Sequence, residues 1–207
     1  MTTPASSLPR RPESVRRLAT FALMLLALSV SCVADPASRC EVVANADPVP
    51  SGAPVSRLVI HRSVAPERVG PIIAAAAEWS RASSGAFVFS VSYLDFPLDA
   101  RPPAGEVWVY TEPKADKSSL TVGVCMTWAY DPKGRPQEAK VWIEEGLDPR
   151  LHYLVALHEL GHALGLTHVE QARPPSIMFP YITDVGDSPT CVDRKRLCEA
   201  WGCEPGC

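Results

Sequence analysis

Residues 158–168 are His158-Glu159-Leu160-Gly161-His162-Ala163-Leu164-Gly165-Leu166-Thr167-His168. If this stretch is helical as far as Leu164, His158 and His162 lie one turn apart on one face, close enough to bind a single metal ion. Glu159 lies beside them and reaches the coordination position that remains, where a zinc-bound water would lie. Two imidazoles and a carboxylate at this spacing predict a catalytic zinc site.

Gly165 explains how a third histidine joins the site. A residue without a Cβ can take the left-handed conformation that ends a helix, so we expect the chain to turn back after Gly165. His168 then returns to the metal. We therefore predict that His158, His162 and His168 bind one Zn²⁺ through neutral imidazoles, and that Glu159 is the general base.

The pattern H-E-x-x-H-x-x-G-x-x-H resembles the metzincin clan of zinc endopeptidases. A second feature follows at Ser176-Ile177-Met178-Phe179-Pro180, which is similar to the Met-turn of that clan and has the form found in matrixins, the family of matrix metalloproteinases. The resemblance implies that Met178 lies beneath the zinc ligands. It also implies an α+β fold with a five-stranded twisted mixed sheet, one antiparallel edge strand, an active-site helix and a small carboxyl-terminal subdomain with a final helix.

The chain departs from the matrixin pattern near the specificity pocket. Val169 stands where matrixins usually carry serine after the third ligand histidine, and Tyr181 follows the Met-turn one place earlier than the familiar tyrosine. Two roles stay open for Tyr181: it could donate a hydrogen bond to the oxyanion that develops during hydrolysis, or it could form a wall of the pocket. The motif therefore leaves the side-chain preference of the site undetermined.

Hydrophobic spacing and turn residues predict the secondary structure of the domain. Strands are expected at 57–62, 87–94, 106–111, 121–130 and 139–144, with a turn at 131–134 and a helix at 66–84. Asp148 followed by Pro149 predicts the start of the active-site helix, and Thr190 with Asp193 predicts the start of the last helix. We expect the segment 121–128 to be the sheet edge that faces the cleft.

Length and composition indicate one exported domain. The 207 residues, with a net charge of −3, allow a single core and give no basic footprint for nucleic acid. Arginines precede an apolar run over 18–30 that is shorter than a membrane-spanning helix, as in an export signal. We divide the chain into a signal peptide over 1–34, a linker over 35–54 and a catalytic domain over 55–207 that ends in a cysteine-rich tail.

Two routes of signal removal are open. Ser29-Val30-Ser31-Cys32 resembles a bacterial lipobox, in which Cys32 would be lipidated and would anchor the protein to a membrane. Cleavage after Ala34 by an ordinary signal peptidase would instead release a secreted protein. On either route we expect an exported monomer that acts on a protein or peptide substrate.

Cysteine usage supports export. Without Cys32, six of the seven cysteines remain, and an even number in an exported chain favours three disulfides over a zinc–thiolate cluster. Cys191 and Cys198, if they share one helix, lie too far apart for a bridge. We therefore expect a disulfide-bonded carboxyl-terminal tail into which Cys40 or Cys125 reaches.

The function predicted from these features is zinc-dependent endoproteolysis. Two alternatives use the same residues: an exported zinc-binding module of this fold with little turnover, and a zinc hydrolase of a non-peptide substrate. The sequence shows no ligand set for a second zinc ion or for calcium, and His61 and His152 are expected to have structural or surface roles. The surroundings of Cys40 do not match the matrixin cysteine switch, so we expect activity without removal of a prosegment.

Overall fold

The structure is a computed structural model that describes residues 55–169, 176–182 and 186–207. The predicted signal peptide with Cys32, the linker and Cys40 lie outside the described residues. Within the described ranges, none of the helices has the length and apolar composition needed to cross a membrane.

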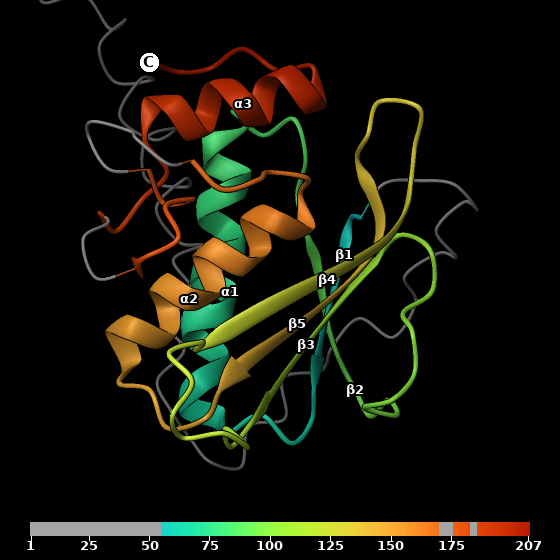
Figure 1. The fold of residues 1–207 in the computed structure, drawn as a ribbon. Coiled ribbons are helices and arrows are strands. Elements are labelled where there is room, and N and C mark those ends of the chain that lie inside the picture. The colour runs from blue at the N-terminus through green and yellow to red at the C-terminus, as the bar shows by residue number, and fades with distance from the viewer. Residues whose placement is uncertain (1–54, 170–175, 183–185) are drawn as a thin grey trace, which may run out of the picture. The chain divides into compact units, whose positions relative to one another are not determined.

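A five-stranded mixed sheet organises the described domain (Figure 1). Its strands are β1 (Arg57–His61), β2 (Ser90–Leu94), β3 (Glu106–Glu112), β4 (Gly123–Tyr130) and β5 (Pro136–Glu144). The spatial order is β2-β1-β3-β5-β4, in which β4 and β5 pair antiparallel and all other neighbours are parallel. The predicted fold class is confirmed, and β4 is the antiparallel edge strand.

The predicted elements differ from the observed ones mainly at their ends. β5 begins at Pro136 because this residue still pairs with Tyr130 across the β4–β5 ladder. The first helix ends at Ala82, two residues earlier than predicted, because Ser84 has a φ of 54°, outside the helical region.

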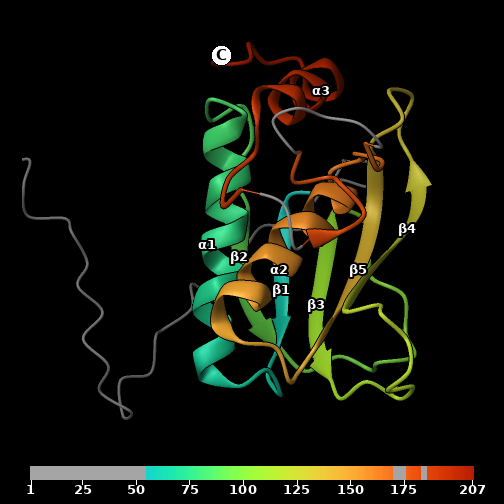
Figure 2. The same cartoon turned by 60° about the vertical axis from the view of Figure 1, so that its left-hand side comes forward.

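Two helices, α1 (Pro66–Ala82) and α2 (Pro149–Ala163), cover one face of the sheet (Figure 2). The indole Nε1 of Trp79 on α1 donates a hydrogen bond of 2.7 Å to the carbonyl oxygen of Leu157 on α2. Both residues are fully buried in the apolar core that the helices share with the sheet. This contact ties the active-site helix to α1.

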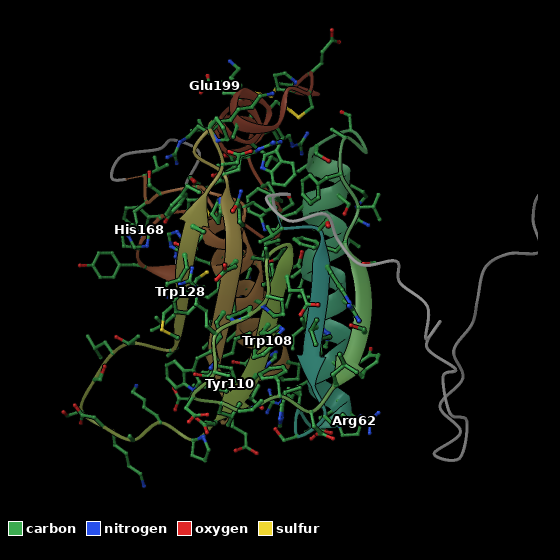
Figure 3. The ribbon with its side chains drawn as sticks, turned by 90° about the vertical axis from the view of Figure 1, so that its right-hand side faces the viewer. Arg62, Trp108, Tyr110, Trp128, His168 and Glu199 are labelled. Carbon is green, nitrogen blue, oxygen red and sulfur yellow. A yellow bond between two sulfur atoms is a disulfide. The ribbon has the colours of Figure 1, made fainter. Side chains whose placement is uncertain are left out.

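The opposite face of the sheet has a smaller apolar cluster. Trp108 and Tyr110 project from β3 on this side, as Figure 3 shows, and Phe96 stacks on Trp108 with ring centroids 4.2 Å apart. Because both of its faces are covered, β3 is buried along almost its whole length.

Asp148 determines where α2 begins. Its carboxylate accepts hydrogen bonds of 3.0 Å from the N–H groups of Arg150 and Leu151, two donors that have no partner inside the helix. Pro149 occupies the first helical position, where a missing N–H costs nothing. The predicted start of the active-site helix is confirmed.

The last helix, α3 (Cys191–Trp201), is closed by two disulfides. The bonds are Cys191–Cys207 and Cys198–Cys203, with Cα atoms 5.5 and 4.5 Å apart. The tail cysteines therefore pair with one another, and the zinc–thiolate alternative does not apply to them. The expectation that Cys40 or Cys125 reaches into the tail is wrong, because the four tail cysteines pair with one another. Among the described residues, Cys125 on β4 has no disulfide partner.

Candidate active site

The active-site helix and the loop after it bring the three predicted ligands together. His158 and His162 come from α2, and Gly165, with a φ of 92°, lets the chain leave the helix as the motif predicts. His168 lies on the loop that follows. Each pair of Nε2 atoms among the three histidines is 3.1 Å apart.

The triangle formed by the Nε2 atoms fits a zinc ion. Three atoms 3.1 Å apart lie about 1.8 Å from the centre of their triangle, a spacing that would suit the roughly 2.0–2.1 Å of zinc–imidazole bonds. Three ligands leave a fourth tetrahedral position open, as in catalytic zinc sites. Within the described residues, a group of three potential metal ligands is formed by these histidines alone, without any carboxylate.

Backbone carbonyls orient two of the imidazoles. Nδ1 of His158 lies 2.8 Å from the carbonyl oxygen of Ile177, and Nδ1 of His162 lies 2.7 Å from that of Leu166. Since a carbonyl oxygen only accepts hydrogen bonds, each Nδ1 carries the proton and each Nε2 keeps a free lone pair for metal. Burial lowers the pKa of His158 to about 4 and also lowers the pKa of His162, so both rings are neutral at neutral pH.

Glu159 is buried beside the ligands. Burial raises the pKa of its carboxyl group to about 8, and a hydrogen bond from the backbone N–H of Cys125 opposes this rise. A group whose pKa lies near neutrality can accept a proton and release it again within one turnover. The environment of Glu159 therefore suits proton transfer.

The Met-turn packs against the ligand-bearing helix. Met178 is fully buried, and its Sδ lies so close to Gly161 of α2 that a Cβ at this glycine would be 2.3 Å from the sulfur. The N–H of Val169 donates a hydrogen bond of 3.0 Å to the carbonyl oxygen of Met178. The segment after His168 is thereby joined to the turn.

Asp193 connects α3 to the Met-turn. Its carboxylate accepts hydrogen bonds from the Ser176 hydroxyl and from the Ile177 N–H at 3.1 Å, and also from the N–H and hydroxyl of Thr190, each at 2.8 Å. Ile177 in turn holds His158 through its carbonyl. The sequence predicts Asp193 only as part of a helix cap, and the spacing of 17 residues from Ser176 gives no local signal for this second role.

Arg196 holds the loop that carries the third ligand. Its Nη1 donates to the carbonyl oxygen of Thr167 at 2.8 Å, and its Nη2 donates to the Thr167 hydroxyl at 2.7 Å. Thr167 directly precedes His168. Sequence reasoning missed this contact because a basic residue on the solvent side of a helix usually has no specific partner.

A cleft of about 650 Å³ separates the edge strand from the ligands. Residues 120–125 line one side of it, and Leu151, the three histidines and Tyr181 line the other. Figure 3 shows His168 beside the strand that carries Trp128. Tyr181 is 69% exposed, and its ring contacts Phe179 edge-on at 5.7 Å.

The two remaining histidines of the chain do not join the triad. His61 is partly exposed at the end of β1, where Nδ1 lies 2.6 Å from the Ser63 hydroxyl. His152 lies on α2 but is fully buried, and within the described part of the chain neither ring nitrogen has a hydrogen-bond partner. Burial lowers the pKa of His152 to about 4.

The mixed sheet, the histidine triad and the Met-turn together match the metzincin class of zinc metalloproteases. A family model described as Peptidase_M10, Matrixin, matches residues 104–195, which include the triad and the Met-turn. The match and the triad support a zinc-dependent metalloprotease with a matrixin-like metzincin domain.

Solved structures are similar to this chain at low sequence identity. The archaemetzincin of Methanopyrus kandleri is 12% identical over 74% of this chain and 99% of its own, with a TM-score of 0.50. A hatching enzyme zinc-protease of the medaka fish Oryzias latipes is 12% identical over 76% of this chain and 94% of its own, with a TM-score of 0.40. Myroilysin is 13% identical over 72% and 82%, with a TM-score of 0.41. No curated protein sequence matches this chain.

Proposed function

We propose that this metalloprotease is an endopeptidase that holds an extended peptide along β4 and cleaves it with Glu159 as general base. The observation that carries the proposal is the position of Glu159: it is buried in the wall of the cleft, next to the triad and in hydrogen-bond contact with the edge strand. A module that only binds zinc has no need of a buried carboxyl group at this point.

The edge strand provides the binding surface. Within the described residues, β4 is the last strand of the sheet and pairs only with β5, and the cleft lies along residues 120–125. An extended peptide can complete the hydrogen bonds of such an edge, with alternate side chains directed into the cleft. This mode positions an internal peptide bond next to the histidines and requires no free chain end.

His158, His162 and His168 are the residues that would hold the ion, and backbone carbonyls accept hydrogen bonds from the Nδ1–H groups of His158 and His162. A bound zinc ion supplies Lewis acidity, which makes water a nucleophile near neutral pH and polarises the scissile carbonyl group. Glu159 takes the proton from the attacking water and delivers it to the leaving amine. Burial of Glu159 keeps this proton away from bulk solvent between the two steps.

Tyr181 forms the outer wall of the cleft in this proposal. Its high exposure and its contact with Phe179 support a role in shaping the pocket, and a hydrogen bond to the oxyanion is the second role that its hydroxyl allows. Tyr181→Phe separates them: a wall residue keeps kcat, whereas an oxyanion donor loses about tenfold or more.

We further propose that the domain begins near Val55 and acts outside the cell, on exported or surface proteins. The two disulfides of the tail support this, because such bonds persist in oxidising compartments. Lipidation of Cys32 would tether the domain to a membrane through residues 35–54, and Cys32→Ser would then release it. Fractionation of cells that express each form tests the anchor independently of the active site.

Digestion of a proteome-derived peptide library tests the proposed activity. We expect the purified protein to cut internal bonds, to stop when a zinc chelator is added and to recover with zinc. Exopeptidase products alone, or hydrolysis of non-peptide esters only, would contradict the proposal. To test strand addition, one backbone amide of a cleaved peptide is N-methylated at a position away from the scissile bond, which should raise KM far more than removing the side chain there.

A further inference from the structure

Gly123 lies where the edge strand meets the active-site helix. It is the first residue of β4 and pairs with Ile143 of β5. A Cβ built on Gly123 would be 2.5 Å from Cγ1 of Val155 and 2.9 Å from Oε1 of Glu159. No real Cβ tolerates either distance, so any side chain here would force Val155, Glu159 or the strand to move.

The close approach of β4 to α2 at Gly123 also matters for Cys125, two residues farther along the strand. The backbone N–H of Cys125 donates to the Glu159 carboxyl group, which requires β4 to lie directly on the helix. Val155 is β-branched and has one strongly preferred rotamer in a helix, so it cannot easily turn away from an added methyl group. The strand or the Glu159 carboxyl group must shift instead, and either shift separates the Cys125 N–H from its acceptor.

We propose that Gly123 is a positioning residue for the reaction: the lack of a side chain at this position allows β4 to hold the Glu159 carboxyl group in place for proton transfer. This inference rests on the proposed role of Glu159 as general base. Gly123 is not one of the metal ligands, and it would act on the reaction through Glu159. Its effect is therefore expected in kcat and not in zinc binding.

The experiment replaces each of two glycines with alanine, in separate variants. Gly123→Ala should lower kcat about tenfold or more, because small displacements of a catalytic group are costly, while zinc content is unchanged. Gly146→Ala is the matched control, since its Cβ would meet nothing within 4 Å. Gly123→Ala with a normal kcat would overturn the proposal, and so would equal losses in kcat and zinc content.

A double variant separates positioning from packing, and it also covers the case in which Gly123→Ala does not fold. Gly123→Ala/Val155→Ala removes the shorter contact and keeps the one with Glu159. Its kcat should stay about tenfold below that of Val155→Ala alone. If kcat returns to the Val155→Ala value, the effect of the methyl group is one of packing and the proposal is wrong.

Glu159→Ala, measured in parallel, distinguishes failure of the proposed function from failure of the positioning role of Gly123. If Glu159→Ala is still active, the proposed function itself fails. If Glu159→Ala is inactive but Gly123→Ala has normal kinetics, only the positioning role fails.

Discussion

Helices α2 and α3 support the same zinc site in different ways. α2 carries two of the proposed ligands and the proposed general base within five consecutive residues, and Gly165 returns the third proposed ligand after one short turn. α3 contributes no ligand. It acts through Asp193, which holds the Met-turn, and through Arg196, which holds the residue before His168. The ligand set is therefore local in sequence, whereas its support comes from residues far along the chain.

Loss of a ligand from α2 should have the largest effect. His162→Ala leaves two imidazoles, so we expect the protein to lose zinc during dialysis and to show no measurable hydrolysis. His61→Ala changes a histidine outside the triad and should keep one zinc per chain. Metal analysis of both proteins checks this, and full zinc occupancy in His162→Ala would exclude it as a ligand.

Removal of the Asp193 carboxylate tests whether α3 supports the zinc site through the Met-turn. Asp193→Ala leaves several buried donors of the Met-turn and of Thr190 without an acceptor, so the free energy of unfolding should fall by about 3 kcal/mol. Glu199→Ala, at an exposed position of the same helix, should change it by less than about 0.5 kcal/mol. Denaturant titration of the two variants gives the comparison; similar values would mean that Asp193 is only a surface cap.

His152 shows that a histidine on α2 need not serve the metal. Its pKa is about 4 in the folded protein, against an ordinary value of 6.5, because burial disfavours the charged ring. Above pH 6.5 both states are neutral and stability is unaffected. Below it the unfolded chain binds the proton more readily, so stability falls toward pH 4 by about 2–3 kcal/mol in total.

His152→Phe removes this titration. Its free energy of unfolding should therefore decline less between pH 6.5 and pH 4 than that of the wild-type protein. Urea titrations at several pH values measure the difference. Parallel pH profiles for the two proteins would show that the buried ring is already charged or hydrated.

Loss of Arg196 should have the smallest effect. Arg196→Ala frees Thr167 but leaves the carbonyls that orient His158 and His162, so zinc affinity should fall by up to about tenfold. Lys195→Ala, exposed on the same helix, is the matched control. Competition with a chromophoric chelator measures both affinities. An unchanged zinc Kd in Arg196→Ala would limit the remote support to Asp193.

The two helices also show what sequence can and cannot predict here. The triad, the turn at Gly165 and the strands follow from short-range spacing and alternation, because each depends on neighbours within one element. The capping box of Thr190 with Asp193 is equally local. The contact of Asp193 with the Met-turn depends on tertiary packing, and no pattern in the sequence predicts it.

Cys125 and Gly123 illustrate the same limit. Counting cysteines predicts disulfides but not their partners, since several connectivities satisfy the same sequence. The expectation that Cys40 or Cys125 reaches into the tail failed because the four tail cysteines pair with one another. The sequence likewise gives no sign that Gly123 matters. Its importance follows only from the structure, which places Val155 and Glu159 against it.

We propose that the histidines hold the metal while Glu159 moves the proton. Glu159→Gln tests it most directly, because the amide has nearly the same shape but cannot accept the proton. We predict that this variant keeps one zinc per chain and loses about 10²- to 10⁴-fold in kcat on a peptide that the wild-type enzyme cleaves. Hydrolysis at close to the wild-type rate, or loss of zinc from the variant, would contradict the account.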